Sequence, residues 1–133
     1  MNGDWKIIRR AGMKTHRDLD VWKLAINYAK YIYLITRHFP KEELYGLVSQ
    51  MCRAVVSIST SISEGAARRS RKELKQFLYI ARASAVELET LLEISKRTNM
   101  TSSDNIEIAK RQNESLITML SALIKRLNTI PIN

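Results

Sequence analysis

The sequence predicts an all-α protein that folds as an antiparallel up-down-up-down four-helix bundle. Four glycines and two prolines in 133 residues supply too few turn residues for the many connections of an all-β fold. Apolar residues recur at spacings of three and four along most of the chain, which is the period of an amphipathic helix. The polar segments between these stretches are short, and short connections force neighbouring helices to run in opposite directions.

The first helix begins near residue 18, after a segment without helical period, and Asp18 or Asp20 can cap it. Its apolar positions are Trp22, Ala25, Ile26, Ala29, Ile32 and Tyr33. The helix stops at His38, Phe39 and Pro40. Additional aromatic residues, at Tyr28, Tyr31 and Tyr33, widen its apolar face beyond one seam. The part of this apolar face that the core does not cover would be exposed on a monomer, which predicts self-association.

The second helix follows Pro40, where the acidic Glu42 and Glu43 suit a helix N-terminus. Its apolar seam consists of Leu44, Val48, Met51, Val55, Ile58 and Ile62. Gly65 is expected to end this helix as a C-terminal glycine. Ser70 then forms a capping-box pattern with Glu73, so a short corner leads into the third helix.

The third helix carries a seam of the same spacing and closes near Lys96, Arg97 and Asn99. The seam residues are Leu74, Leu78, Ala81, Ala85, Leu88, Leu92 and Ser95. Residues 101–104 supply caps for the fourth helix, whose seam is Ile106, Ala109, Asn113, Leu116, Leu120, Leu123 and Leu127. Asn113 is either a buried polar residue that sets helix register or part of a solvent-facing edge.

The net charge of +9 is concentrated in two stretches of the chain. Basic residues exceed acidic ones by five in residues 65–82 and by four in residues 1–17, and the rest of the chain is neutral. A neutral scaffold with a basic corner and a basic tail is typical of a protein that binds a polyanion, although a solvated helix face has the same composition. The candidate nucleic-acid-binding residues are Arg68, Arg69, Arg71, Lys72, Lys75 and Arg82.

Other charged residues beside the apolar stripes favour a structural role. Glu87 and Glu89 point about 200° apart around a helix, so they cannot converge on one substrate from the same chain. Opposite charges on facing helices can instead pair across the bundle or between protomers. The predicted structural polar network consists of Arg53, Glu64, Glu87 and Glu89.

No constellation for catalysis, metal binding or membrane insertion is evident. His16 and His38 lie far apart, so they form no metal-ligand cluster, and neither is placed to activate a serine. Cys52, the only cysteine, excludes an intrachain disulfide and fits a reducing cytoplasm; it is either a small buried residue or a reactive thiol. No apolar run approaches the roughly 18 residues that span a bilayer. These observations predict a non-enzymatic, cytoplasmic protein without cofactor or metal.

Motif residues in the first three helices resemble a known pattern. They are Asp18, Leu19, Asp20, Val21, Trp22, Phe39, Pro40, Tyr45, Gly46, Leu47, Gln50, Arg53, Ala54, Ser57, Ile58, Ile62, Ser63, Glu64, Gly65, Arg68, Lys72, Glu73, Phe77, Leu78, Ala81, Ser84, Glu87, Leu88, Glu89 and Thr90. Over about residues 16–127 the chain resembles the four-helix-bundle family encoded within intervening sequences of bacterial 23S ribosomal RNA genes, a family similar to the accessory variability proteins of diversity-generating retroelements. The resemblance implies a ring-shaped homopentamer and a basic nucleic-acid-binding surface.

The chain departs from the usual family pattern in the second helix. Ser59, Ser61 and Ser63 stand where proline, asparagine and alanine are common in the family. A serine in place of proline restores a backbone donor, so we expect a straighter helix here.

Together these features predict a homo-oligomeric protein that contacts the phosphates of RNA or DNA through the basic corner, as an accessory to a larger nucleoprotein machine. The alternative is a scaffold whose basic corner docks an acidic protein. The expected organisation is a basic N-terminal tail over residues 1–17, the bundle over 18–128 and a C-terminal tail over 129–133.

Overall fold

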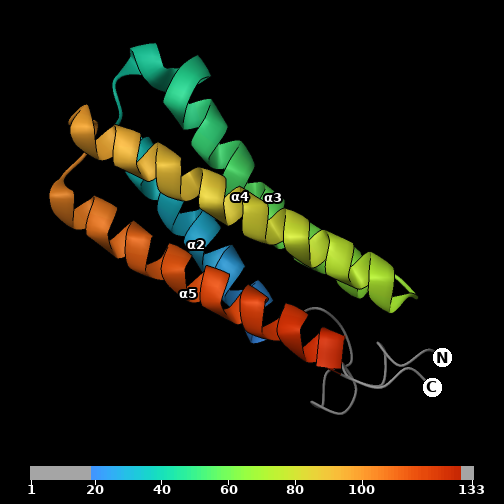
Figure 1. The fold of residues 1–133 in the computed structure, drawn as a ribbon. Helices are drawn as coiled ribbons and strands as arrows, with labels where there is room; N and C mark the ends of the chain where they lie inside the picture. The colour runs from blue at the N-terminus through green and yellow to red at the C-terminus, as the bar shows by residue number, and fades with distance from the viewer. Residues whose placement is uncertain (1–18, 130–133) are drawn as a thin grey trace.

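The computed structural model describes residues 19–129, and all regular elements in this range are helices (Figure 1). They are α2 (Asp20–Thr36), the 3₁₀ helix η2 (Lys41–Glu43), the π-helical segment η3 (Leu44–Val48), α3 (Ser49–Ala66), α4 (Arg71–Arg97) and α5 (Ser103–Thr129). The prediction of an all-α chain with four main helices is therefore confirmed. The predicted basic tail, residues 1–17, and most of the C-terminal tail, residues 130–133, lie outside the described residues.

One apolar core joins the four main helices. Extensive contacts pair α3 with α4 and α4 with α5, and α2 packs on both α3 and α5. All seven predicted seam residues of α4 are buried. In α5 the buried stripe follows the prediction to Leu120 and then passes through Ile124 to Leu127, which leaves Leu123 only half-buried. The prediction for Leu123 is wrong because a 3.6-residue helix drifts away from a strict heptad.

The core face of α2 is rotated from the predicted one. Tyr28 was expected to contribute to apolar surface left exposed on the monomer, but it is fully buried. Ile26 and Tyr33, which were expected to face the core, are exposed. Tyr31 is half-buried and its hydroxyl donates to the Asn105 carbonyl oxygen at 3.4 Å. Leu19 occupies the N-cap without a side-chain bond, and Asp20 is already helical, so Asp20 is not the cap; Asp18 lies outside the described residues.

The second helix is not continuous from Pro40, contrary to the prediction. A 3₁₀ turn and a π-helical segment precede α3, and the backbone at Gly46 leaves helical geometry with φ −109° and ψ −111°. The Glu43 carboxylate accepts a hydrogen bond from the Leu47 amide at 3.4 Å across this kink. Because the kink breaks the helical period, Leu44 is 53% exposed and the core seam starts at Met51.

From Ser49 onward α3 is uninterrupted, including the serines that depart from the family pattern. Ser59 and Ser61 are buried in it, and the Ser59 hydroxyl donates to the Val56 carbonyl at 3.1 Å. A hydroxyl bonded to its own helix backbone is satisfied without a partner helix, so these small residues permit close packing.

The corner between α3 and α4 depends on a capping serine and a crowded glycine. Ser70 is the N-cap of α4, and its hydroxyl accepts from the Glu73 amide at 3.1 Å, as the capping-box pattern predicted. Gly65 is a buried residue inside α3, which ends one residue later, and the following Ala67 remains right-handed. A Cβ at Gly65 would lie 2.8 Å from the Phe77 Cβ. Glycine is therefore required here for the close approach of two helices rather than for a left-handed cap.

Gly65→Ala is expected to destabilise the protein by about 1–3 kcal/mol, because the added methyl forces α3 and α4 apart. Urea denaturation followed by circular dichroism measures this change. Glu64→Ala, at the exposed neighbouring position, is the control and is expected to stay within about 0.5 kcal/mol of wild type. Equal stability of Gly65→Ala and wild type would contradict the crowding.

Asn113 and Tyr28 bring polar groups into the apolar core. Asn113 is 1% exposed and its Nδ2 donates to the Ala85 carbonyl at 2.8 Å, so it belongs to the buried seam rather than to a solvent-facing edge. Burial, and secondarily the charge of Glu89, raise the pKa of Tyr28 far above its ordinary value. Tyr28 is therefore a neutral core residue, and its hydroxyl has no protein partner among the described residues.

Candidate nucleic-acid interface

Most of the predicted binding residues lie together around the α3–α4 corner. Arg68 and Arg69 occupy the connection, and Arg71, Lys72 and Lys75 follow in the first turns of α4. Arg68, Arg69 and Lys72 are exposed, whereas Arg71 and Lys75 are half-buried. Because the connection is short and Ser70 caps the next helix, these cations project from one small region.

The C-terminal part of α5 adds two basic residues at this end of the molecule. The Lys75 ammonium donates to Asn128 Oδ1 at 2.9 Å, which ties the start of α4 to the end of α5. Figure 1 shows both segments toward the same end of the molecule. Lys125 and Arg126 are exposed there. The resulting surface, called the basic end below, consists of Arg68, Arg69, Arg71, Lys72, Lys75, Lys125 and Arg126.

Sequence reasoning missed Lys125 and Arg126 because they fall in the part of the chain whose charges cancel. The available signal was their position near the end of the fourth helix. Helices joined by short turns alternate in direction, so the end of the fourth helix is expected at the same end of the bundle as the corner between the second and third helices. Glu64, near the end of α3, and Glu73, in the first turn of α4, are the carboxylates nearest the corner in sequence, and both are exposed.

Arg82 lies apart from the basic end, about 10 Å further along α4 than Lys75. Its guanidinium donates to Ser121 Oγ at 3.2 Å and lies 5.0 Å from the centre of the Tyr79 ring. Arg82 therefore links α4 to α5, and this engagement makes it a weaker candidate for phosphate contact than the corner arginines.

The aromatic residues near the corner are covered by cations. The Arg68 guanidinium lies 4.9 Å from the centre of the Phe77 ring, which is itself half-buried. Tyr79 has its own guanidinium neighbour in Arg82. A ring with one face under a guanidinium offers less area to a stacking base, so the chemistry of this surface is dominated by charge.

The four residues of the predicted polar network do not form a single cluster in the protomer. Arg53 and Glu87 line one groove between α3 and α4, beside the hydrogen bond that Ser84 Oγ donates to Ser57 Oγ at 2.9 Å. Glu89 lines a different groove between α4 and α5. Glu64 lies exposed near the end of α3. Pairing of these residues between protomers stays a prediction.

Other charged side chains connect α4 to α5. Lys110 contacts Glu93 at 3.1 Å, and Lys96 contacts Glu107 at 3.3 Å. The hydrogen bond from Lys110 is the main cause that lowers the pKa of the Glu93 carboxyl. Pairs between helices depend on how the helices are aligned, which explains why spacing within one helix did not indicate them.

Residues 19–129 contain no group of three or more histidine, cysteine or acidic side chains arranged to hold a metal ion. Within the same range, no helix has the length and apolar character needed to cross a membrane.

A family model and a solved structure match this chain. A family model described as 23S rRNA-intervening sequence protein matches residues 17–122. A crystal structure of a protein with unknown function from the S23 ribosomal protein family of Bacteroides thetaiotaomicron matches with a TM-score of 0.74 at 24% sequence identity, over 79% of this chain and 95% of that chain. At this identity the likeness shows the fold alone. Among curated proteins, none matches the chain.

Proposed function

Because the chain belongs to the family of 23S rRNA-intervening sequence proteins, we propose that it is a non-enzymatic protein that binds RNA or DNA with its basic end. The observation that carries this proposal is the presence of seven cations at one end of the molecule, from two segments about 50 residues apart in sequence. Guanidinium and ammonium groups neutralise phosphates and release condensed counterions, which supplies affinity for any polynucleotide.

The proposed contacts are to the backbone rather than to bases. Arg68 is held beside the Phe77 ring, so one cation is oriented before a ligand arrives. The partly covered rings of Phe77 and Tyr79 favour charge contacts over base stacking. We therefore expect weak sequence preference and steep salt dependence.

The protomer is proposed to be an antiparallel up-down-up-down bundle. Two contacts support it: Lys75, early in α4, bonds to Asn128, late in α5, and Lys96, late in α4, bonds to Glu107, early in α5. Opposite ends of the two helices are paired in each case, as antiparallel packing requires.

The protomer is further proposed to assemble as a cytoplasmic homopentameric ring that serves a larger nucleoprotein machine. Large apolar side chains exposed on the outer faces of α2, α3 and α4 support self-association. They include Ile26, Tyr33, Leu34, Val56, Tyr79, Ile80, Val86 and Ile94. A ring presents several basic ends to one polyanion, so modest contacts gain avidity. Light scattering after size exclusion is expected to give about five times the 15.3 kDa chain mass.

Fluorescence anisotropy with labelled single-stranded RNA, duplex RNA and duplex DNA tests the function. The logarithm of the affinity is expected to fall linearly with the logarithm of salt concentration, by about 0.9 per neutralised phosphate for duplex DNA and about 0.7 for single strands. The ranking of the three probes identifies the target class. Absence of binding to all three at low salt contradicts the proposal, and retained binding to an acidic protein would then favour the scaffold.

A further inference from the structure

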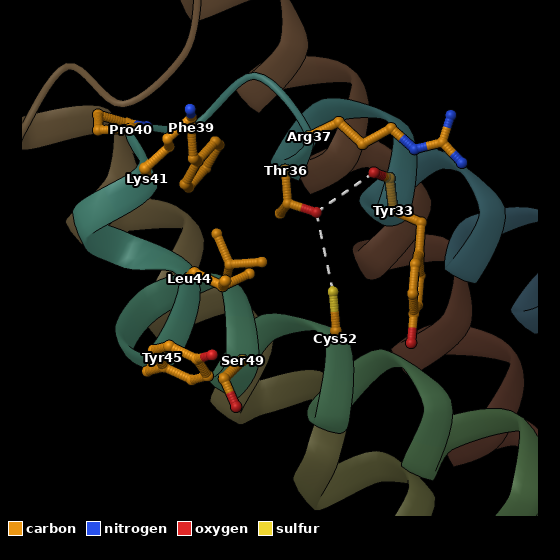
Figure 2. A pocket seen from close by; sticks show the side chains of 11 residues that line it. Tyr33, Thr36, Arg37, Phe39, Pro40, Lys41, Leu44, Tyr45, Ser49 and Cys52 are labelled. Atoms are coloured by element: carbon orange, nitrogen blue, oxygen red, sulfur yellow. Dashed lines mark hydrogen bonds between the residues drawn. The ribbon is translucent and has the colours of Figure 1, made fainter.

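The kink before α3 leaves a pocket at the opposite end of the molecule from the basic end (Figure 1). Its walls are the end of α2, the connection around Pro40, the segments η2 and η3, and the start of α3. Its volume is about 520 Å³, within the about 300–1,000 Å³ of small-molecule sites. Figure 2 shows Phe39 and Leu44 on one side of the hollow and Thr36, Cys52 and Tyr33 on the other.

The interior of this pocket is mainly apolar. Phe39 is buried at its back, and Leu44 and Val48 complete the lining. Tyr45 lies at its edge and is 93% exposed, an unusual position for a large aromatic ring. The Thr36 hydroxyl already donates to the Ile32 carbonyl at 2.8 Å, so it does not need a ligand partner. Covering this surface removes apolar area from water, which favours a ligand with an apolar body.

The charged residues of the lining are both cations. Arg37 and Lys41 are exposed, and the lining includes no carboxylate. Figure 2 shows the Arg37 side chain extending outward past Tyr33 rather than into the hollow. An apolar interior with a cationic rim complements a ligand that is apolar over most of its length and anionic at one end.

We propose that this pocket binds a small amphipathic anion, a medium-length apolar chain that ends in a carboxylate. The chain lies between Phe39, Leu44 and Val48, and the carboxylate lies at the rim, where Arg37 and Lys41 on opposite sides of the opening attract it. A neutral molecule of the same length fills the interior without the charge contacts, and an amphipathic cation is repelled at the rim. The site uses no residue of the basic end, so it stands independently of nucleic-acid binding.

Cys52 provides the test, because it is the only cysteine and lies half-buried in the pocket wall. Decanoate below its micellar concentration is expected to slow alkylation of Cys52 by N-ethylmaleimide about fivefold or more at saturation, by covering the thiol. Decanol should bind more weakly, and decylamine, which is protonated at pH 7, should protect least. Calorimetry measures the binding of all three probes independently of the thiol.

Matched variants locate the site. Leu44→Asp is expected to abolish decanoate binding, whereas Ile108→Asp, at an exposed apolar residue of α5 outside the pocket, leaves it unchanged. Arg37→Gln combined with Lys41→Gln should raise the dissociation constant of decanoate about fivefold, as expected for two exposed charge contacts, and leave decanol unaffected.

Three outcomes overturn the proposal. One is the absence of decanoate binding by calorimetry together with unchanged alkylation. Another is equal binding of decanoate and decylamine, which indicates an unselective apolar surface. The third is a Cys52 thiol that reacts only after dilution has dissociated an oligomer, which shows that a second copy of the chain covers the pocket.

Discussion

Replacement of Arg68, Arg69, Arg71 and Lys72 by glutamate is expected to weaken nucleic-acid binding by about 100-fold or more at low salt. Each change removes a phosphate contact and adds a charge that repels the backbone. The salt dependence should become shallower by roughly one unit of log–log slope per lost contact. Fluorescence anisotropy gives both quantities, and circular dichroism is expected to report unchanged helicity because the corner lies outside the core.

The control reverses four other exposed basic residues, Lys30, Arg37, Lys41 and Arg111. Both variants change the net charge from +9 to +1, so they differ only in where the charge is lost. The control is expected to retain most of the affinity. Equal losses in the two variants would indicate a response to total charge, and full affinity in the corner variant would contradict the proposed interface.

A pair of substitutions in α5 tests whether nucleic acid contacts the whole basic end or only the α3–α4 corner. Lys125→Glu with Arg126→Glu is expected to weaken binding about tenfold or more, because both exposed residues lie near the end of α5, which the Lys75–Asn128 hydrogen bond holds against the start of α4. Unchanged affinity would restrict the interface to the α3–α4 corner.

Leu120→Ala is expected to destabilise the protein by about 2–5 kcal/mol, the cost of losing buried methyl groups and leaving a cavity. Leu120 is 0% exposed and lies in the buried stripe of α5. The measurement is the free energy of unfolding from urea denaturation at a fixed protein concentration, because a homo-oligomer gains stability with concentration.

Leu123→Ala is the matched control, because the same substitution on the same helix cancels any change in helix propensity. Leu123 is only half-buried, so we expect a loss of about 1 kcal/mol. The heptad pattern assigns both leucines to the seam and predicts similar losses. Equal destabilisation would contradict the protomer packing described here.

Local patterns predicted much of this fold. The α4 seam is buried at every predicted position, and the Ser70 cap lies where the capping box placed it. Both features follow from interactions within about one turn of the chain, because the helical period and the N-cap bond depend on residues three or four apart. The family resemblance was also confirmed over residues 17–122.

Features that depend on contacts between helices were predicted poorly. The role of Gly65 depends on Phe77, which belongs to the next helix, and the burial of Tyr28 depends on how α2 is rotated against α3 and α5. The kink at Gly46 changes which residues of the second helix face the core. The spacing of apolar residues along the chain does not reveal these features. When the apolar face of a helix is broad, the helix can be rotated about its axis to several positions that bury similar apolar area.

The candidate sites follow the same pattern: features that depend on neighbouring residues were predictable, and features that depend on contacts between helices were not. Residue composition and short-range spacing were enough to predict the all-α class, the order of the helices and the basic corner. The folded protein was needed to show that Lys125 and Arg126 lie at the same end as the corner, that the Arg82 guanidinium bonds to Ser121, and that a pocket opens beside Leu44. These arrangements bring together side chains from different helices, and their alignment depends on how the whole core packs.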